Sequence, residues 1–160
     1  MLYIASDHGG FKLKEHLKAW LLVSGGRVTD LGPASFSPED DYPDYAKKVA
    51  VKVSKNPPSF PSPSGRGRGE GDFGILICRS GQGVCIVANK FKGVRAGLVW
   101  NTKEAKASRN DDHTNILCLP SDYINFAEAR ATVKTWLDTP WSKDSRHVRR
   151  VKKIIKLERT

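Results

Sequence analysis

The chain lacks several features that would place it in a specialised class of protein. No apolar run approaches the ~20 residues that a membrane-spanning helix needs, so we expect no membrane partner. Only three cysteines are present, Cys78, Cys85 and Cys118; their number is odd, and their spacing is not that of a metal site. Reduced thiols, no metal ion and a cytoplasmic location are the interpretation that fits this pattern.

We also expect no secretion signal. The first residues enter an apolar segment at once, without the charged region and cleavage site of a signal peptide. The composition is ordinary for a globular protein, since 39% of the 160 residues are hydrophobic and 28% are charged. This length predicts one domain, residues 1–160, that is large enough to bury a core.

Acidic residues are few enough to leave a net charge of +10. More than half of it comes from residues 146–160, which hold seven Lys or Arg and one Glu. A basic helix face in contact with solvent is the simplest interpretation, followed by capture of a small molecule that carries phosphate. A nucleic-acid partner is not expected, because no nucleic-acid-binding motif is present and the aromatic residues are not interleaved with the basic ones.

Short apolar segments alternate with amphipathic ones, which is typical of a parallel sheet covered by helices on both faces. The predicted strands are 2–5, 28–31, 75–77, 94–99 and 115–119. The predicted helices are 11–23, 43–54, one that begins at 84, 102–110, 125–137 and 145–157. We therefore predict an α/β fold, a single-domain, Rossmann-like three-layer sandwich with a five-stranded parallel sheet.

Residues 55–71 interrupt this alternation. Pro, Ser and Gly dominate the segment, and no part of it is expected to bury a face, so we predict a flexible surface insertion. A lid over a site is the alternative, since the strand that follows leads into the most informative motif of the chain.

That motif is Gly74–Lys90, GILICRSGQGVCIVANK. A β-branched apolar run ends on Cys78, and the small residues at 80–83 lead into a helix that begins at Val84. Ligands of open α/β sheets bind at the carboxyl ends of the strands, and N–H groups at a helix start favour negative charge. The Cys78 thiol is thus placed as a nucleophile or base, or else it is a small core residue.

Two further groups of residues suit a charged ligand. Asp7 and His8 follow the first predicted strand, at the same edge of the sheet, although Asp7 is equally suited to cap the next helix. Arg146 and Arg150 are four residues apart and share one face of the basic helix. Two guanidinium groups on one face offer planar forks of donors for a phosphate dianion.

Six segments, in order along the chain, carry a resemblance to one known family. They are SDHGG at 6–10, DYPDYA at 41–46, the 74–90 segment, KGVRA at 92–96, TNIL at 114–117 and RHVRRV at 146–151. With them the chain resembles the sugar-phosphate isomerases that include ribose-5-phosphate isomerase type B and galactose-6-phosphate isomerase. The resemblance implies the fold given above, no cofactor, and a homodimer or homotetramer whose active sites are shared between subunits.

The resemblance also implies roles in the Gly74–Lys90 segment. An aldose–ketose isomerase removes a proton next to the carbonyl, stabilises the enediolate and returns the proton to the neighbouring carbon. Cys78 matches the base, and Ser80 matches a hydroxyl at the reacting carbons. The amides of Gly81 and Gly83 match the anion hole for the enediolate.

Substrate contacts are implied outside that segment. The residues matched to contacts with the sugar or its phosphate are Asp7, His8, Tyr42, Arg146 and Arg150. In the family the arginine pair usually binds phosphate across the subunit interface. His147 belongs to the same motif and is also expected at the substrate.

The chain departs from the family most at residues 111–115. The segment usually reads His-Asn-Asp-(Ala/Thr)-Asn, and here Asp111 stands at the place of the ring-opening histidine. Asp112 follows, at a position expected to contact the substrate. We hypothesise that Asp111 and His113 share the proton transfers of ring opening, the alternative being a helix-capping and surface role.

Two smaller departures lie near the expected phosphate and base. A turn that usually ends in a phosphate-binding arginine is replaced by residues 120–122, and Arg79 stands where a glycine is usual. The resemblance favours metal-independent isomerisation of ribose 5-phosphate to ribulose 5-phosphate. The alternatives are isomerisation of another pentose or hexose phosphate, a non-catalytic sugar-phosphate-binding protein, and an accessory protein for nucleic acid.

Overall fold

The computed structural model describes residues 1–60 and 71–158. Its strands are β1 (Leu2–Ser6), β2 (Val28–Asp30), β3 (Phe73–Cys78), β4 (Ala96–Leu98) and β5 (Ile116–Pro120). In this part of the chain they form one sheet in the order β2-β1-β3-β5-β4, with every pair of neighbours parallel. The predicted five-stranded parallel sheet is confirmed, with β4 shorter than expected.

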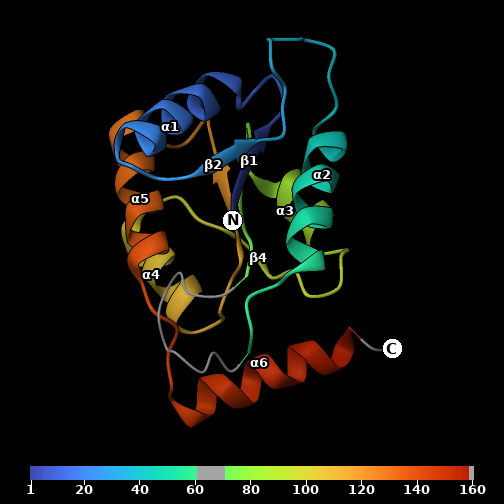
Figure 1. The fold of residues 1–160 in the computed structure, drawn as a ribbon, viewed down its shortest axis with the longest axis vertical. Coiled ribbons are helices and arrows are strands. Elements are labelled where there is room, and N and C mark those ends of the chain that lie inside the picture. The colour runs from blue at the N-terminus through green and yellow to red at the C-terminus, as the bar shows by residue number, and fades with distance from the viewer. Residues whose placement is uncertain (61–70, 159–160) are drawn as a thin grey trace.

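Helices cover both faces of this sheet, as predicted (Figure 1). The helices on one face are α1 (Phe11–Val23), α4 (Thr102–Asn110) and α5 (Phe126–Asp138). The helices on the other face are α2 (Tyr42–Lys55) and α3 (Gln82–Ala88). The molecule is therefore the predicted three-layer α/β sandwich, although α3 begins two residues before the predicted start.

The central strand β3 divides the core in two because alternate side chains of a strand point to opposite faces. Ile75 and Ile77 pack with α1 and α5, whereas Leu76 and Cys78 pack with α2 and α3. Every residue of β3 is buried, which is the reason that its sequence is continuously apolar rather than alternating.

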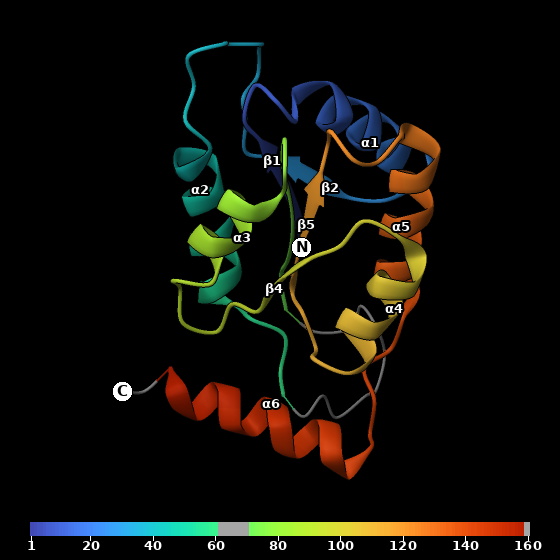
Figure 2. The ribbon, with the colours of Figure 1, turned by 180° about the vertical axis from the view of Figure 1, so that it is seen from behind.

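The last helix, α6 (Ser145–Leu157), lies apart from the three layers (Figures 1 and 2). Of its side chains only His147 and Val151 are buried. The Glu158 carboxylate accepts a hydrogen bond of 3.0 Å from the N–H of Gly93, which precedes β4. The basic helix therefore runs along the amino-end side of the sheet.

The predicted insertion at 55–71 lies largely outside the described residues, so its role as loop or lid stays a prediction. The described first part of this segment differs from the expectation that no part of it buries a face. The ring of Phe60 lies 4.8 Å from that of Trp141 and 5.3 Å from that of His113. No helix within residues 1–60 and 71–158 is long and apolar enough to cross a membrane.

Candidate active site

Cys78 is the last residue of β3, and its side chain is almost fully buried beside the loop that follows. The N–H of Gly81 donates a hydrogen bond of 3.2 Å to the Cys78 sulfur. Gly81 has a φ of +71°, and a Cβ there would lie 2.4 Å from a methyl carbon of Leu98. Glycine is thus required at this position for the loop to curl around the sulfur.

Tyr42 and Ser80 lie at the same loop. A Cβ on Gly83 would lie 2.6 Å from ring carbons of Tyr42, so the tyrosine ring packs directly on the glycine. Ser80 is exposed, and its Oγ accepts a hydrogen bond of 3.3 Å from the N–H of Gln82. The structure therefore gathers Cys78, Ser80, both glycines and Tyr42 at the carboxyl edge of the sheet.

Asp7 adds a buried carboxyl group at this edge, one residue beyond β1. Its Oδ1 accepts a hydrogen bond of 3.0 Å from the N–H of Gly10. Burial raises the pKa of Asp7, and the hydrogen bond from Gly10 opposes this effect. The capping alternative is wrong, because the N-cap of α1 is Gly10 and no side chain in the described part of the chain caps the helix; Asp7 instead closes the turn just before α1.

His8 is held by an acidic residue that the sequence analysis did not select. The Asp40 Oδ1 lies 2.8 Å from the His8 Nδ1 and also accepts the His8 main-chain N–H at 2.8 Å. The hydrogen bond with Asp40 raises the pKa of His8. The acidic run Glu39–Asp41 was the only signal of such a partner in the sequence.

A second group gathers at the other end of the sheet. The Nδ1 of His147 lies 3.2 Å from Oδ1 of Asp111, and Arg146 Nε donates a hydrogen bond of 3.0 Å to His147 Nε2. Arg150 is exposed on the same helix. Burial, and then the charge of Asp111, raise the pKa of Asp112, while His147 and Arg150 lower it.

His113 does not join the second group. It is 2% exposed, its Nδ1 lies 3.1 Å from a guanidinium nitrogen of Arg95, and its ring packs against those of Phe60 and Trp141, which also contact each other. Burial, reinforced by two nearby arginines, lowers the pKa of His113 to about 3. This geometry does not support the hypothesis that His113 shares ring opening with Asp111, because the contacts of the His113 ring are with Arg95 and aromatic side chains, whereas Asp111 lies beside His147.

The two groups lie at opposite edges of the sheet within one chain. Cys78 pairs with Pro120 at the carboxyl end of β5, whereas the loop that carries Asp111 precedes the amino end of β5 at Ile116. At ~3.3 Å per residue, β5 alone separates the two edges by roughly 13 Å. One chain therefore brings the predicted site residues together as two separate clusters.

The departures at Arg79 and Asp122 compensate each other. The Arg79 side chain is 71% exposed, and its Nε lies 3.9 Å from an oxygen of Asp122. Arg79 therefore extends toward solvent and Asp122 rather than toward the Cys78 sulfur. The neighbouring Ser121 hydroxyl lies 3.0 Å from the Gly9 carbonyl and 3.2 Å from that of Cys78, which ties two loops of the carboxyl edge.

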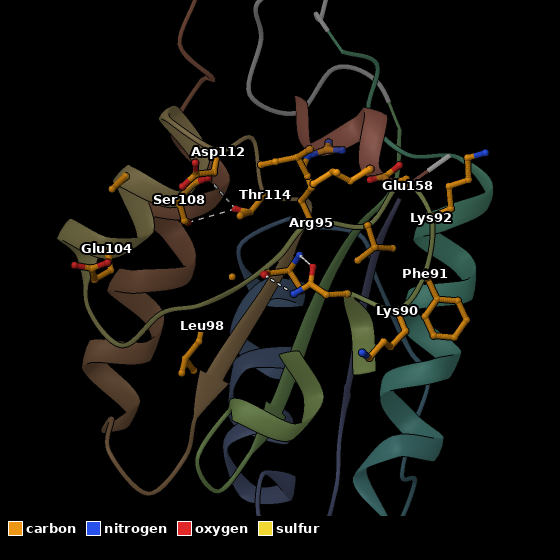
Figure 3. A pocket seen from close by; sticks show the side chains of 17 residues that line it. Lys90, Phe91, Lys92, Arg95, Leu98, Glu104, Ser108, Asp112, Thr114 and Glu158 are labelled. Atoms are coloured by element: carbon orange, nitrogen blue, oxygen red, sulfur yellow. Dashed lines mark hydrogen bonds between the residues drawn. The ribbon is translucent and has the colours of Figure 1, made fainter. Parts of the chain in front are cut away.

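A large cavity lies away from Cys78, beside the edge strand β4. Its volume is about 750 Å³, and its walls come from the segment before β4, from α4 and from the end of α6 (Figure 3). Among its labelled residues are Arg95, Asp112 and Glu158. Among residues 1–60 and 71–158, no three His, Cys, Asp or Glu side chains are grouped so that they could hold a metal ion.

Comparison with known proteins gives a consistent result over nearly the whole chain. The family model described as ribose/galactose isomerase matches residues 2–154. A probable ribose-5-phosphate isomerase B of Mycoplasma genitalium is 42% identical over 158 residues, which cover 99% of this chain and 95% of that protein. The ribose-5-phosphate isomerase B of Mycobacterium tuberculosis is 31% identical over 159 residues, covering 99% and 90%.

Solved structures agree with these relatives. The crystal structure of the Mycoplasma genitalium enzyme with bound ribulose-5-phosphate has a TM-score of 0.86 and 41% identity, covering 99% of this chain and 95% of the other. That of the Thermotoga maritima enzyme has a TM-score of 0.83 and 39% identity, covering 97% of each chain. The resemblance found in the sequence is thus confirmed, and the chain belongs to the ribose/galactose isomerase family.

Proposed function

We propose that this protein is an aldose–ketose isomerase that converts ribose 5-phosphate to ribulose 5-phosphate through an enediolate, without a metal ion or cofactor. The observation that carries the proposal is the Cys78 thiol, held by the Gly81 amide at the carboxyl edge of the sheet. The full-length similarity to ribose-5-phosphate isomerases B supports the choice of substrate.

The chemistry follows from the groups around this thiol. In the open-chain sugar, Cys78 in its thiolate form takes the proton from C2 and becomes a thiol, the C2 electron pair forms the C1–C2 double bond, and the negative charge moves to O1. The loop amides of Gly81 and Gly83 stabilise that charge, as an anion hole does. The Ser80 hydroxyl moves a proton between the two oxygens, and Cys78 then returns its proton to C1.

We further propose that the working site forms between two copies of the chain, in a homodimer or homotetramer. The phosphate-binding candidates Arg146 and Arg150 are exposed on α6, at the edge of the sheet opposite to Cys78. A second copy that presents its α6 to the carboxyl edge of the first would supply them. The position of α6, apart from its own three layers, supports this arrangement (Figure 2).

Ring opening is then reassigned within the second group. His147 has one ring nitrogen beside Asp111 and the other beside the exposed Arg146, within the cluster that carries the phosphate-binding candidates, although the His147 side chain is itself largely buried in the single chain. We propose that His147 carries the proton to or from the sugar ring and that Asp111 orients it. Histidine suits both directions of proton transfer.

The function is tested by an isomerisation assay over a panel of pentose and hexose phosphates, with and without a chelator. Ribose 5-phosphate should be the best substrate, and the chelator should have no effect. Cys78→Ala should lower kcat by about 10²–10⁴-fold, the usual worth of a positioned proton-transfer group, while binding persists.

Cys118→Ala is the matched control because Cys118 is a buried thiol on the neighbouring strand β5. It should lower stability but not kcat. Near-normal turnover in Cys78→Ala would place the base elsewhere. Binding of ribose 5-phosphate without turnover by the unaltered protein would favour the non-catalytic alternative.

A further inference from the structure

Asp40 occupies a position to which neither the family motifs nor the proposed chemistry assigns a role. We propose that Asp40 is a positioning residue of the substrate site, which fixes the His8 ring so that its Nε2 is presented to the phosphate or sugar. This inference rests on the proposed function for the identity of the substrate, but not for the pairing of the two residues.

The pairing is unusually constrained for a loop. One oxygen of Asp40 binds both the main-chain N–H of His8 and its Nδ1, each at 2.8 Å. The two contacts fix the backbone and the ring plane together, and they place the Nδ1 proton toward Asp40. The Asp40 side chain is 8% exposed and that of His8 is 34% exposed, so the carboxylate lies behind a histidine that solvent and substrate can reach.

The loop that carries Asp40 is itself anchored. The fully buried ammonium group of Lys14 donates a hydrogen bond of 2.7 Å to the Pro33 carbonyl and another of 2.8 Å to Asp30. The N–H of Ser6 donates to the Gly32 carbonyl at 3.0 Å, and α2 begins just after Asp41. The loop is thus fixed on one side of Asp40 by the contacts of Gly32 and Pro33, and on the other side by the start of α2. A residue that orients a ring must itself be held in place in this way.

The charges around His8 favour its protonated form. The hydrogen bond with Asp40 raises the pKa of His8, and the charge of Asp7 adds to this while burial opposes it. Tyr45 on α2 adjoins Asp40. Burial raises the pKa of Tyr45 most, and the charge of Asp40 raises it further. The Arg79 side chain packs on Gly9 from the other side. An imidazolium held in this way is a suitable partner for a phosphate dianion.

Asp40→Asn tests the proposal because the amide oxygen still accepts the main-chain N–H but carries no charge. Above pH 7 the KM for ribose 5-phosphate should rise by about tenfold, with kcat changed by less than about twofold, since the loss of charge lowers the protonated fraction of His8. Near pH 5.5 the difference should narrow because His8 is then protonated in both proteins. Glu39→Gln, which removes the same charge from the adjacent exposed residue, should leave KM unchanged.

Two measurements separate this role from a purely structural one. An NMR titration of the His8 ring, without substrate, should show a lower pKa in Asp40→Asn than in the unaltered protein and no change in Glu39→Gln. In a His8→Gln background, Asp40→Asn should add nothing to the rise in KM, because the two act as a unit. An unchanged His8 titration, or additive effects on KM, would overturn the proposal. If the protein does not isomerise ribose 5-phosphate at all, the proposed function fails while the titration still decides the pairing.

Discussion

The two histidines nearest to Asp111 have opposite surroundings. The His147 ring lies beside the carboxylate of Asp111 and beside Arg146, its neighbour on α6. The His113 ring lies among aromatic side chains, with its pKa lowered to about 3 by burial and then by nearby arginines. At the residue scale, position 113 is therefore a neutral core site, whereas the ring at position 147 has an acidic neighbour and a basic neighbour.

The ring-opening step distinguishes His147 from His113 experimentally. His147→Asn should slow isomerisation of the cyclic sugar phosphate by about 10²-fold, the lower range for loss of an acid–base group. With an analogue that cannot cyclise, the same variant should be nearly as fast as the unaltered protein. His113→Asn should affect both substrates equally. If His113→Asn instead slows only the cyclic substrate, the original pairing of Asp111 with His113 is restored.

His113 should also make stability depend on pH. Its pKa is about 3 in the folded protein and near 6.5 when unfolded, so protonation favours the unfolded chain. As far as His113 is concerned, the free energy of unfolding has its full value above pH 6.5. It decreases as the pH falls toward 3, by up to about 1.4 kcal/mol for each pH unit.

His113→Asn removes this titration, and asparagine tolerates the φ of +53° found at this position. Urea unfolding at pH 6.5 and pH 4.5 should show a smaller loss of stability in the variant than in the unaltered protein. Parallel losses in the two proteins would mean that other groups cause the pH dependence.

At the scale of elements, α4, α5 and β3 are joined through a polar contact inside an apolar core. The Arg109 guanidinium lies over the rings of Phe73 and Trp136, 5.0 and 5.4 Å from their centres. The Trp136 Nε1 donates a hydrogen bond of 2.9 Å to the Thr114 hydroxyl, just before β5. This contact fixes the start of β5 and thereby the loop that carries Asp111.

Thr114→Val keeps the shape of this side chain but leaves the buried indole N–H without its acceptor and removes the hydrogen bond of 3.1 Å from the Thr114 hydroxyl to the Ser108 carbonyl. The free energy of unfolding should fall by about 1–3 kcal/mol, the usual cost of an unsatisfied buried donor. Thr132→Val is the matched control, since Thr132 is fully buried and its hydroxyl has no hydrogen-bond partner in the described part of the chain. The control should be neutral or stabilising. Equal losses in denaturant unfolding would show that the indole contact contributes little.

The elements themselves were predictable because their signals are local. Alternation and caps predicted β1, β3 and the six helices to within a few residues, and the order of motifs predicted the family. The contacts that decide residue roles were not local. The Asp40–His8 pair joins residues 32 positions apart, and the packing of Phe60 on His113 joins a predicted free loop to the core. No periodicity or motif records such pairings.

At the scale of the whole molecule, the proposed chemistry requires two edges of the sheet to meet. The carboxyl edge holds the thiol, the glycine loop and the His8 ring, whereas the amino edge holds Asp111, Asp112 and the basic face of α6. The proposed two-fold assembly would pair these edges twice and give two equivalent sites. In this proposal, the exposed positive charge of α6 serves to bind the phosphate in a neighbour's site.

Complementation between two inactive variants tests this central claim most directly. Cys78→Ala disables the carboxyl edge and Arg150→Ala disables the amino edge, so each variant alone should be nearly inactive. When equal amounts of the two variants are unfolded together and refolded as random dimers, about half of the dimers should be mixed. Each mixed dimer has one intact site out of two, so activity should recover to about a quarter of that of the unaltered protein. A mixture no more active than the separate variants, although mass spectrometry shows that mixed dimers have formed, would mean that each site lies within a single chain.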